Sequence, residues 1–251
     1  MIELRTLGTV ELVRAEADAI RPLVAQPKPL ALLVYLALVT PRGFHRRDTL
    51  LALLWPDQTA THARASLRQA VHVLRHTLGN KVIVGRGDEE LAVDRDHLWC
   101  DAVALDDAVA RGDYAEGPRL YQAEFLRGFH IREAPEFESW CDGERVRLRH
   151  QASLAARALA EEALLDGNAP DAARWARWAA ALQPWDEIAL RNLVTVLCGM
   201  GDRAQALKIY DEFAERLERE LRVRPSGATR RFIETVKNSG DFEPAPAGST
   251  Y

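Results

Sequence analysis

One segment, Thr61–Leu78, combines a regular apolar stripe with a surface that carries basic and polar side chains but no acidic one. Read as an α-helix, it places six apolar residues on one face, at the i, i+3, i+4, i+7 spacing of a buried stripe. An ordinary surface helix mixes both charge signs, because opposite charges three or four positions apart stabilise it. We therefore predict a helix that packs on a core with one face and presents cations on the other. The stripe consists of Ala63, Leu67, Ala70, Val71, Leu74 and Leu78.

The outward face of this helix has the side chains that recognise a nucleic acid. Arginine pairs bidentately with guanine edges or phosphates, glutamine pairs with adenine, and small residues let the backbone approach. Arg64, Arg68 and Arg75 flank the face and can reach either bases or phosphates. A solvated cationic face without a ligand is the alternative for this helix taken alone. The residues that point most directly away from the stripe, and are expected to face base edges, are Thr61, Ala65, Gln69 and His72.

The flanking segments predict a small domain with a β-ribbon. Two short strands are predicted, one on each side of Gly8-Thr9, and residues 19–23 are a candidate for a third short strand. An apolar helix then opens at Pro27, a position where proline is well tolerated, and a second helix covers Asp48–Trp55. After the basic helix, Lys81–Val93 is typical of a β-hairpin. This order predicts a winged helix-turn-helix, in which the last helix enters the major groove.

Three further cations are candidates for contacts with the DNA backbone. Arg86 lies in the predicted hairpin, where a wing can place it against phosphates or in the minor groove. Arg46 and Arg47 precede the second helix and could touch phosphate. For these two residues a plain charged loop is the alternative.

Three blocks of sequence carry a resemblance to a known family. In this order and at this spacing they resemble the Streptomyces antibiotic regulatory protein (SARP) family, which joins an OmpR-type winged helix to a bacterial transcriptional activator domain (BTAD). The resemblance implies a transcriptional activator that recruits RNA polymerase holoenzyme at promoter direct repeats. We expect the helical half of the chain to position the protein against RNA polymerase or against a second copy, as a homodimer on double-stranded DNA. The blocks are Lys28 with Ala31–Ala37, Arg47–Leu50 with Leu54–Asp57, and Ala63–Ala70 with Leu74-Arg75.

The second half of the chain, residues 99–225, has an almost wholly helical pattern. Gly167 and Gly201 are 34 positions apart, which is the tetratricopeptide (TPR) spacing. A weaker third copy begins at Gly112, with Gly117 at a position where small residues let paired helices approach. The pattern predicts stacked helix pairs that share one core. Generic antiparallel helices are the alternative.

Short runs in this half also resemble the activator domain. They include Trp99-Cys100-Asp101, Phe137-x-x-Trp140 and Leu217-x-x-Glu220-Leu221. One departure is Arg222, which stands where the family usually has glycine. The resemblance covers roughly residues 1–238 and leaves the exact turn at Arg222 in question.

The predicted fold is mainly α, with an N-terminal winged helix-turn-helix (α+β) followed by an all-α TPR-like helical repeat domain. We assign residues 1–96 to the DNA-binding domain and 97–238 to the BTAD. Residues 239–251 hold Pro, Ala, Gly and Ser with little apolar content, so we expect a disordered tail.

The distribution of charge agrees with this division. The chain has a net charge of −4. Residues 1–95 hold 13 basic and 10 acidic side chains, a balance of +3, and the remainder holds 20 and 27, a balance of −7. This asymmetry favours a DNA-binding part coupled to an acidic part that faces other partners.

Other function classes find little support in the sequence. There is no phosphate-binding glycine loop, no metal-binding His-Glu-x-x-His and no serine elbow, so we expect no catalytic residues, no metal and no cofactor. The three cysteines are widely spaced, and no apolar run approaches the length of a membrane span, so we expect a cytoplasmic protein without membrane contact. The alternative function is a protein-interaction scaffold in which the winged helix no longer binds DNA.

Overall fold

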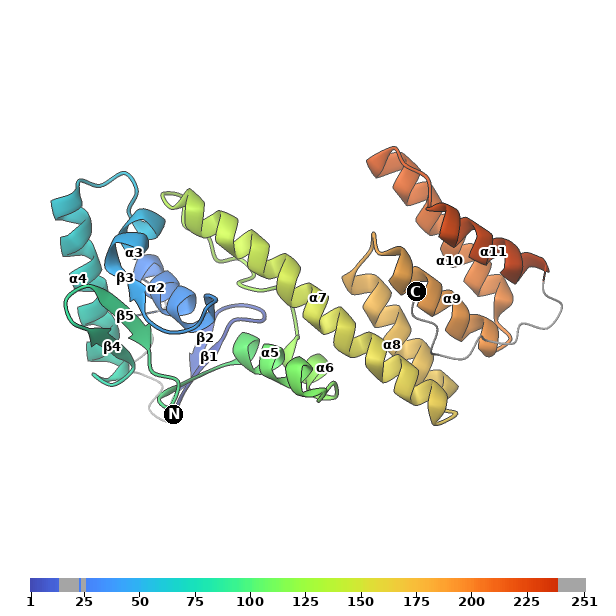
Figure 1. Ribbon diagram of the computed structural model, residues 1–251, viewed down its shortest axis with the longest axis horizontal. Coiled ribbons are helices and arrows are strands. Elements are labelled where there is room, and N and C mark those ends of the chain that lie inside the picture. Colours follow the sequence, from blue (N-terminus) through green and yellow to red (C-terminus); the bar gives the residue numbers. More distant parts are fainter. Residues whose placement is uncertain (14–22, 24–25, 239–251) are drawn as a thin grey trace. The chain divides into compact units, whose positions relative to one another are not determined.

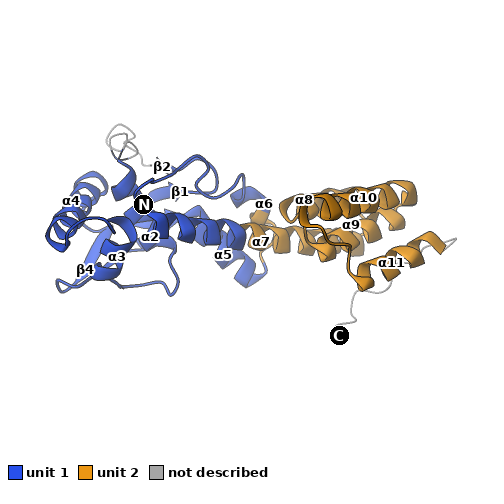
Figure 2. Ribbon diagram, turned by 90° about the horizontal axis from the view of Figure 1, so that it is seen from above, with its two compact units in different colours: residues 1–112, 118–148 blue, residues 113–117, 149–251 orange. Residues whose placement is uncertain are grey.

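The structure, a computed structural model, describes residues 1–13, 23 and 26–238, and this part of the chain is mainly helical (Figure 1). The chain divides into two compact units (Figure 2). The first comprises Met1–Gly112 and Pro118–Leu148, and the second comprises Asp113–Gly117 and the residues from Arg149 onward. The expected disordered tail at 239–251 lies outside the described residues. The candidate third strand at 19–23 also lies outside them, except for residue 23.

The first unit contains a three-stranded sheet with the order β2-β1-β6. The two short strands predicted around Gly8-Thr9 are present as β1 (Ile2–Arg5) and β2 (Glu11–Val13), and the structure pairs them in the antiparallel sense. Strand β6 (Leu98–Cys100) runs parallel to β1. The helical pattern assigned from residue 99 onward is therefore wrong at its start. The strand depends on β1, which is almost a hundred positions away in the sequence.

A buried carboxylate joins this sheet to the helix that follows it. Asp101 is the first residue of α5 (Asp101–Arg111), and its side chain accepts hydrogen bonds from the Thr6 amide at 2.8 Å and the Leu7 amide at 2.9 Å. The Thr6 hydroxyl donates a further hydrogen bond at 2.7 Å. These charge-assisted bonds compensate the burial of the carboxylate and fix the end of β1 against the start of α5.

Three helices form the predicted core of the first unit, and a small sheet flanks them. Helix α2 is buried along nine consecutive residues, and α3 and α4 both contact it. The predicted hairpin is present as β4 and β5, and a short strand that the sequence analysis did not identify, β3, pairs with β5. The bounds are α2 (Pro27–Leu38), β3 (His45–Arg46), α3 (Arg47–Leu54), α4 (Ala60–Leu78), β4 (Ile83–Arg86) and β5 (Glu90–Val93).

After the short helix α6 (Glu116–Leu120), the long helix α7 (Pro135–Leu165) begins in the first unit. Its first turns carry Phe137 and Trp140, and the Trp140 ring lies 4.9 Å from the ring of Tyr35 on α2. Aromatic side chains bury a large apolar area, so this contact attaches the start of α7 to the three-helix core.

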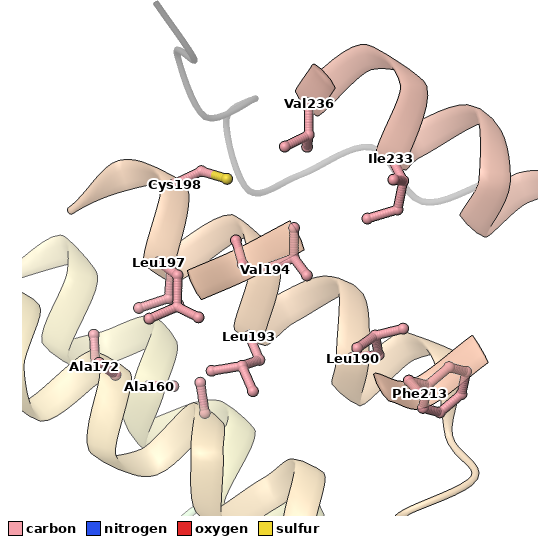
Figure 3. Packing of buried hydrophobic residues seen from close by; sticks show 14 of the residues in the cluster. Ala160, Ala172, Leu190, Leu193, Val194, Leu197, Cys198, Phe213, Ile233 and Val236 are labelled. Atoms are coloured by element: carbon pink, nitrogen blue, oxygen red, sulfur yellow. The ribbon is translucent and has the colours of Figure 1, made fainter. Parts of the chain in front are cut away.

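The second unit stacks antiparallel helices around a continuous apolar core (Figure 3). Alanines on α7 and α8 pack against the Leu and Val side chains of α9, and Phe213 of α10 and Ile233 of α11 complete the cluster. The small alanine side chains allow the close approach of neighbouring helices that shared cores of this kind require. The bounds are α8 (Ala169–Leu182), α9 (Glu187–Gly199), α10 (Arg203–Arg216), the π-helical turn η2 (Leu217–Leu221) and α11 (Gly227–Asn238).

The 34-residue period is visible as one turn that occurs twice. Gly167 and Gly201 both have positive φ, 72° and 78°, and each is the second residue after the end of a helix. The amide of the next residue bonds a carbonyl five positions earlier in each case, at 2.8 Å for Asn168 and 2.9 Å for Asp202. The side chains of Asn168 and Asp202 then cap α8 and α10 in the same way. Identical hydrogen bonds at a spacing of 34 explain why glycine recurs at this period.

Candidate nucleic-acid interface

Helix α4 has the two faces that its sequence predicted. Its buried residues are the six members of the predicted apolar stripe. The N-cap residue Thr59 makes no capping bond and instead shares a 3.0 Å hydrogen bond with His62. Gly79, with φ 102°, ends the helix. The residues between are mostly good helix formers, so α4 presents nineteen residues in regular geometry.

The residues proposed for base contacts lie in the open. Thr61, Ala65, Gln69 and His72 are all exposed, as are Arg64 and Arg68. Within the described part of the chain, Arg64, Arg68 and Gln69 have no hydrogen-bond or ion-pair partner. The face therefore offers unpaired donors to a ligand.

Arg75 differs from the other two arginines of α4. Its side chain is half-buried, and its Nε donates a 3.0 Å hydrogen bond to the carbonyl of Ile83 on β4. This bond attaches the last turns of the helix to the β-ribbon. The remaining guanidinium donors are the ones left for a ligand.

Arg47 occupies the junction of α3, α4 and the ribbon. Its amide donates a 2.7 Å hydrogen bond to the Glu89 carbonyl, and its Nε is buried without a partner in the described structure. Burial lowers the pKa of Arg47, and the nearby charges of Arg75 and Arg68 lower it further, partly offset by Asp88. Three guanidinium groups thus share one region without enough acid to balance them.

The two other proposed backbone contacts are partly engaged within the protein. Arg86 donates a 2.5 Å hydrogen bond from Nε to Glu90, and its guanidinium lies 4.7 Å from the ring centre of Phe44. Its side chain is still 66% exposed. Arg46 is exposed, with one nitrogen 4.0 Å from the Asp48 carboxylate. Both cations remain open to an additional phosphate.

Two hollows lie along this surface, and Arg47 and Arg68 line both. One, of about 400 Å³, also contains Asp48, Asp88 and Glu89. The other, also of about 400 Å³, has no acidic lining residue. The structure thus brings Arg47, Arg68, His72 and Arg75 together at the second hollow, whereas Arg86 stays with Glu90 on the ribbon.

A family model described as the bacterial transcriptional activator domain matches residues 101–237, more than half of the chain. The chain belongs to the BTAD family. This confirms the activator-domain part of the resemblance to SARP proteins, and it places the chain in a family of transcriptional regulators. No curated protein matches the chain.

The fold of this BTAD protein is shared with a solved structure. Mycobacterium tuberculosis EmbR in complex with a low affinity phosphopeptide aligns with a TM-score of 0.66 and 19% sequence identity. The similarity covers 94% of this chain and 65% of the EmbR chain, so the chain spans about two thirds of the length of that structure. At this identity the likeness shows the fold alone.

The BTAD match and the compact units divide the chain differently. The match begins at Asp101, the residue whose carboxylate holds the end of β1. The first unit nevertheless includes α5 and the beginning of α7. The first residues of the matched domain therefore pack with the three-helix core.

Two side chains at the interface were not proposed as site residues from the sequence. His76 and Asn80 both line the acid-free hollow. The position of His76, four residues after His72, was a signal, because residues with this spacing lie on one helix face. Asn80 follows the helix-ending glycine, and no sequence pattern indicated that its side chain turns toward α4.

The described residues contain no group of three or more His, Cys, Asp or Glu side chains arranged to hold a metal ion. Over the same residues, none of the helices has the length and apolar character needed to span a bilayer.

Proposed function

We propose that this BTAD protein is a sequence-specific DNA-binding transcriptional regulator, an activator rather than an enzyme, and that α4 is its recognition helix. The proposal depends on one observation: the outward face of α4 carries Arg64, Arg68 and Gln69 without partners among the described residues, and the helix has no acidic residue. A winged helix-turn-helix places its last helix in the major groove in this way.

Each exposed residue then has a distinct role. Thr61, Ala65, Gln69 and His72 face base edges, while Arg64 and Arg68 reach bases or phosphates. The more buried or engaged cations hold the DNA backbone, which fixes the register of the helix on the duplex. These are Arg75, Arg47, Arg46 and Arg86.

The family supports the remainder of the proposal. A transcriptional activator acts on the transcription machinery, so the helical repeats of residues 97–238 are proposed to contact RNA polymerase holoenzyme or a second copy of the chain. Promoter direct repeats are the expected DNA targets. A TPR-like domain with a shared core offers an extended surface for such partners.

Selection from a pool of random DNA duplexes with the full chain, followed by titration of the selected duplex, tests this function. Arg68→Ala should weaken binding by about 1–3 kcal/mol if Arg68 makes a bidentate base contact, and the preference at one base pair should relax. If Arg68 touches only phosphate, the loss should be uniform over sequences and the salt slope should fall by about one.

Arg177→Ala is a matched control, because Arg177 is an exposed helical arginine on α8, outside the proposed interface. It should leave the affinity for DNA unchanged. Failure of the unmodified chain to enrich any duplex, even at low salt, would instead favour the protein-interaction scaffold.

A further inference from the structure

The acid-free hollow is lined by residues of α4, by Arg47 at the start of α3 and by Asn80 in the turn that leads to β4. Figure 1 shows α4 beside α3 and β4. Its volume is about 400 Å³. The neighbouring hollow contains three acidic side chains, whereas this one contains none. Its chemistry therefore favours an anion. The lining residues are Arg47, Arg68, Val71, His72, Arg75, His76 and Asn80.

Around the hollow, three arginines lie near one another, and one carboxylate, Asp88, opposes their positive charge at Arg47. Arg75 and Arg68 both act on Arg47 as like charges, and Asp88 is the nearby carboxylate that opposes them. The buried Nε of Arg47 has no hydrogen-bond acceptor among the described residues. A buried donor without a partner is costly. An anion bound beside Arg47 would balance part of the positive charge that Arg47, Arg68 and Arg75 share.

Two histidines extend this cationic surface along the helix. The rings of His72 and His76 are stacked, with centroids 6.2 Å apart and planes inclined by 13°. Both residues are exposed, and within the described part of the chain neither ring has a hydrogen-bond partner. Histidine is the side chain whose charge changes between about pH 5 and 8. The pair can therefore add up to two positive charges to the hollow.

We propose that this hollow binds one phosphate of the DNA backbone, held by Arg47, Arg75, His72 and His76, and that the histidines bind it in their protonated form. The inference rests on the proposed function, because it assumes that α4 docks on a duplex. It assigns His76 to the interface and gives His72 a phosphate contact in place of a base edge. Asn80 supplies a neutral donor at the rim.

The sign of the resulting pH dependence follows from the surrounding charges. Arg68 and Arg75 on α4 and Arg47 on α3 face the histidines, Asp88 lies near Arg47, and Lys81 is exposed beside Asn80. A bound phosphate attracts imidazolium, so DNA binding takes up protons and the affinity increases as the pH falls.

The test measures DNA affinity at two pH values, at constant salt, with the full chain and the selected duplex. We expect about tenfold tighter binding at about pH 6.0 than at about pH 7.5. The double variant His72→Gln with His76→Gln should respond by less than about twofold and keep the same preferred sequence. His76→Arg, which has one permanent charge at this position, should bind more tightly than the unmodified chain at the higher pH and should respond less to pH.

His62→Gln is the matched control, because His62 is exposed on the same helix but does not line the hollow. It should show the full pH response of the unmodified chain. Far-UV circular dichroism should be unchanged in every variant, because all three histidines are on the surface.

A second measurement identifies the phosphate itself. A neutral methylphosphonate replaces one backbone linkage at a time across the selected duplex. One replacement should weaken the unmodified chain at the lower pH and have little effect on the double glutamine variant, which is the coupling expected of two groups in contact.

The outcomes separate this inference from the proposed function. Equal pH responses in the unmodified chain and the double variant, with DNA bound by both, would overturn the phosphate site and leave the proposed function intact. If the unmodified chain binds no duplex at both pH values, the proposed function is overturned as well.

Discussion

Arg222 adopts a backbone conformation that side chains other than glycine rarely take. It follows the π-helical turn η2 with φ 58° and ψ 31°, in the left-handed region. This region costs a residue with a Cβ about 1–2 kcal/mol. The resemblance to the SARP family led us to expect glycine at this position, so arginine here adopts the turn that glycine would favour and adds strain to it.

Replacing Arg222 with glycine should therefore stabilise the chain. We expect Arg222→Gly to raise the free energy of unfolding by about 0.5–1 kcal/mol, because the relief of strain exceeds the added flexibility of glycine in the unfolded chain. Urea denaturation followed by circular dichroism measures it. Arg219→Gly, in the right-handed part of the same turn, should instead lower stability by a similar amount.

At the scale of single residues, the sequence predicted which side of α4 each residue faces, but it did not predict their partners. The six buried positions follow from the helical period alone. The bond from Arg75 to Ile83 and the contacts of Arg86 with Glu90 and Phe44 depend on where other segments end in space. The division of the cations into free and engaged groups was therefore not predictable, and their contacts with DNA stay predictions.

In the second unit, the close packing of α6 against α7 depends on a position, Gly117, where no side chain fits. A Cβ added to Gly117 would lie 2.6 Å from the Cβ of Ala155 on α7. Real Cβ atoms do not approach so closely, and neither side chain has a flexible end that could move. Glycine at this position therefore sets the distance between the two segments.

A methyl group at Gly117 should force these elements apart. We expect Gly117→Ala to lower the free energy of unfolding by about 1–3 kcal/mol, the usual cost of overpacking. Gly143→Ala on α7 is the matched control, since its Cβ would meet nothing within 4 Å. Because alanine favours a helix interior, this control should be neutral or stabilising by up to about 1 kcal/mol. Equal losses in the two variants in urea denaturation would contradict a packing cause.

At the scale of elements, the long periodic helices, the hairpin and the strands β1 and β2 were predictable, and the strands β3 and β6 were not. The pattern of α4 and the repeated glycines after α7 and α9 are local signals. Strands β3 and β6 have two and three residues, too few for a period to appear, and each depends on a partner strand that is distant in the sequence. Asp101, which holds β1 against α5, acts through contacts that no spacing reveals.

Over the whole molecule, the negative net charge of −4 is compatible with the proposed DNA contact, because the charges are unevenly distributed. Residues 1–95 have a balance of +3 and the rest have −7. Fields in salt solution decay over about 10 Å, so in the proposed complex the local cations of α4 would matter more for binding a duplex than the net charge does. Each unit also contains an ionised carboxylate that pairs with arginine side chains, Asp107 in the first unit and Glu187 in the second.

In each unit, one carboxylate with a lowered pKa makes the free energy of unfolding depend on pH in the acidic range. Burial alone would raise the pKa of Asp107, but hydrogen bonds and charges from Arg42 and Arg95 outweigh it and hold the pKa below its ordinary value. Burial likewise opposes the lowered pKa of Glu187, which accepts hydrogen bonds from the Ser226 amide at 2.9 Å and from the hydroxyls of Ser226 and Thr229.

Both groups bind protons less readily in the folded chain than in the unfolded one, so acid favours unfolding. The stabilisation is complete above the ordinary carboxyl pKa values near 4 and is lost as the pH falls below them. Solvent screens both sites, so each should contribute only about 0.5–1 kcal/mol. Asp107→Asn and Glu187→Gln should each lower stability at neutral pH and reduce the further loss between about pH 5 and 3.

Urea denaturation over this pH range, for the unmodified chain and the two variants, makes the measurement. Asp166→Asn serves as the control, since Asp166 is exposed and its side chain has no ion pair among the described residues. Because Asp107 and Glu187 belong to different units and have different partners, their effects should add in the double variant. An acid-induced loss that is unchanged in that double variant would mean that other carboxylates govern the response.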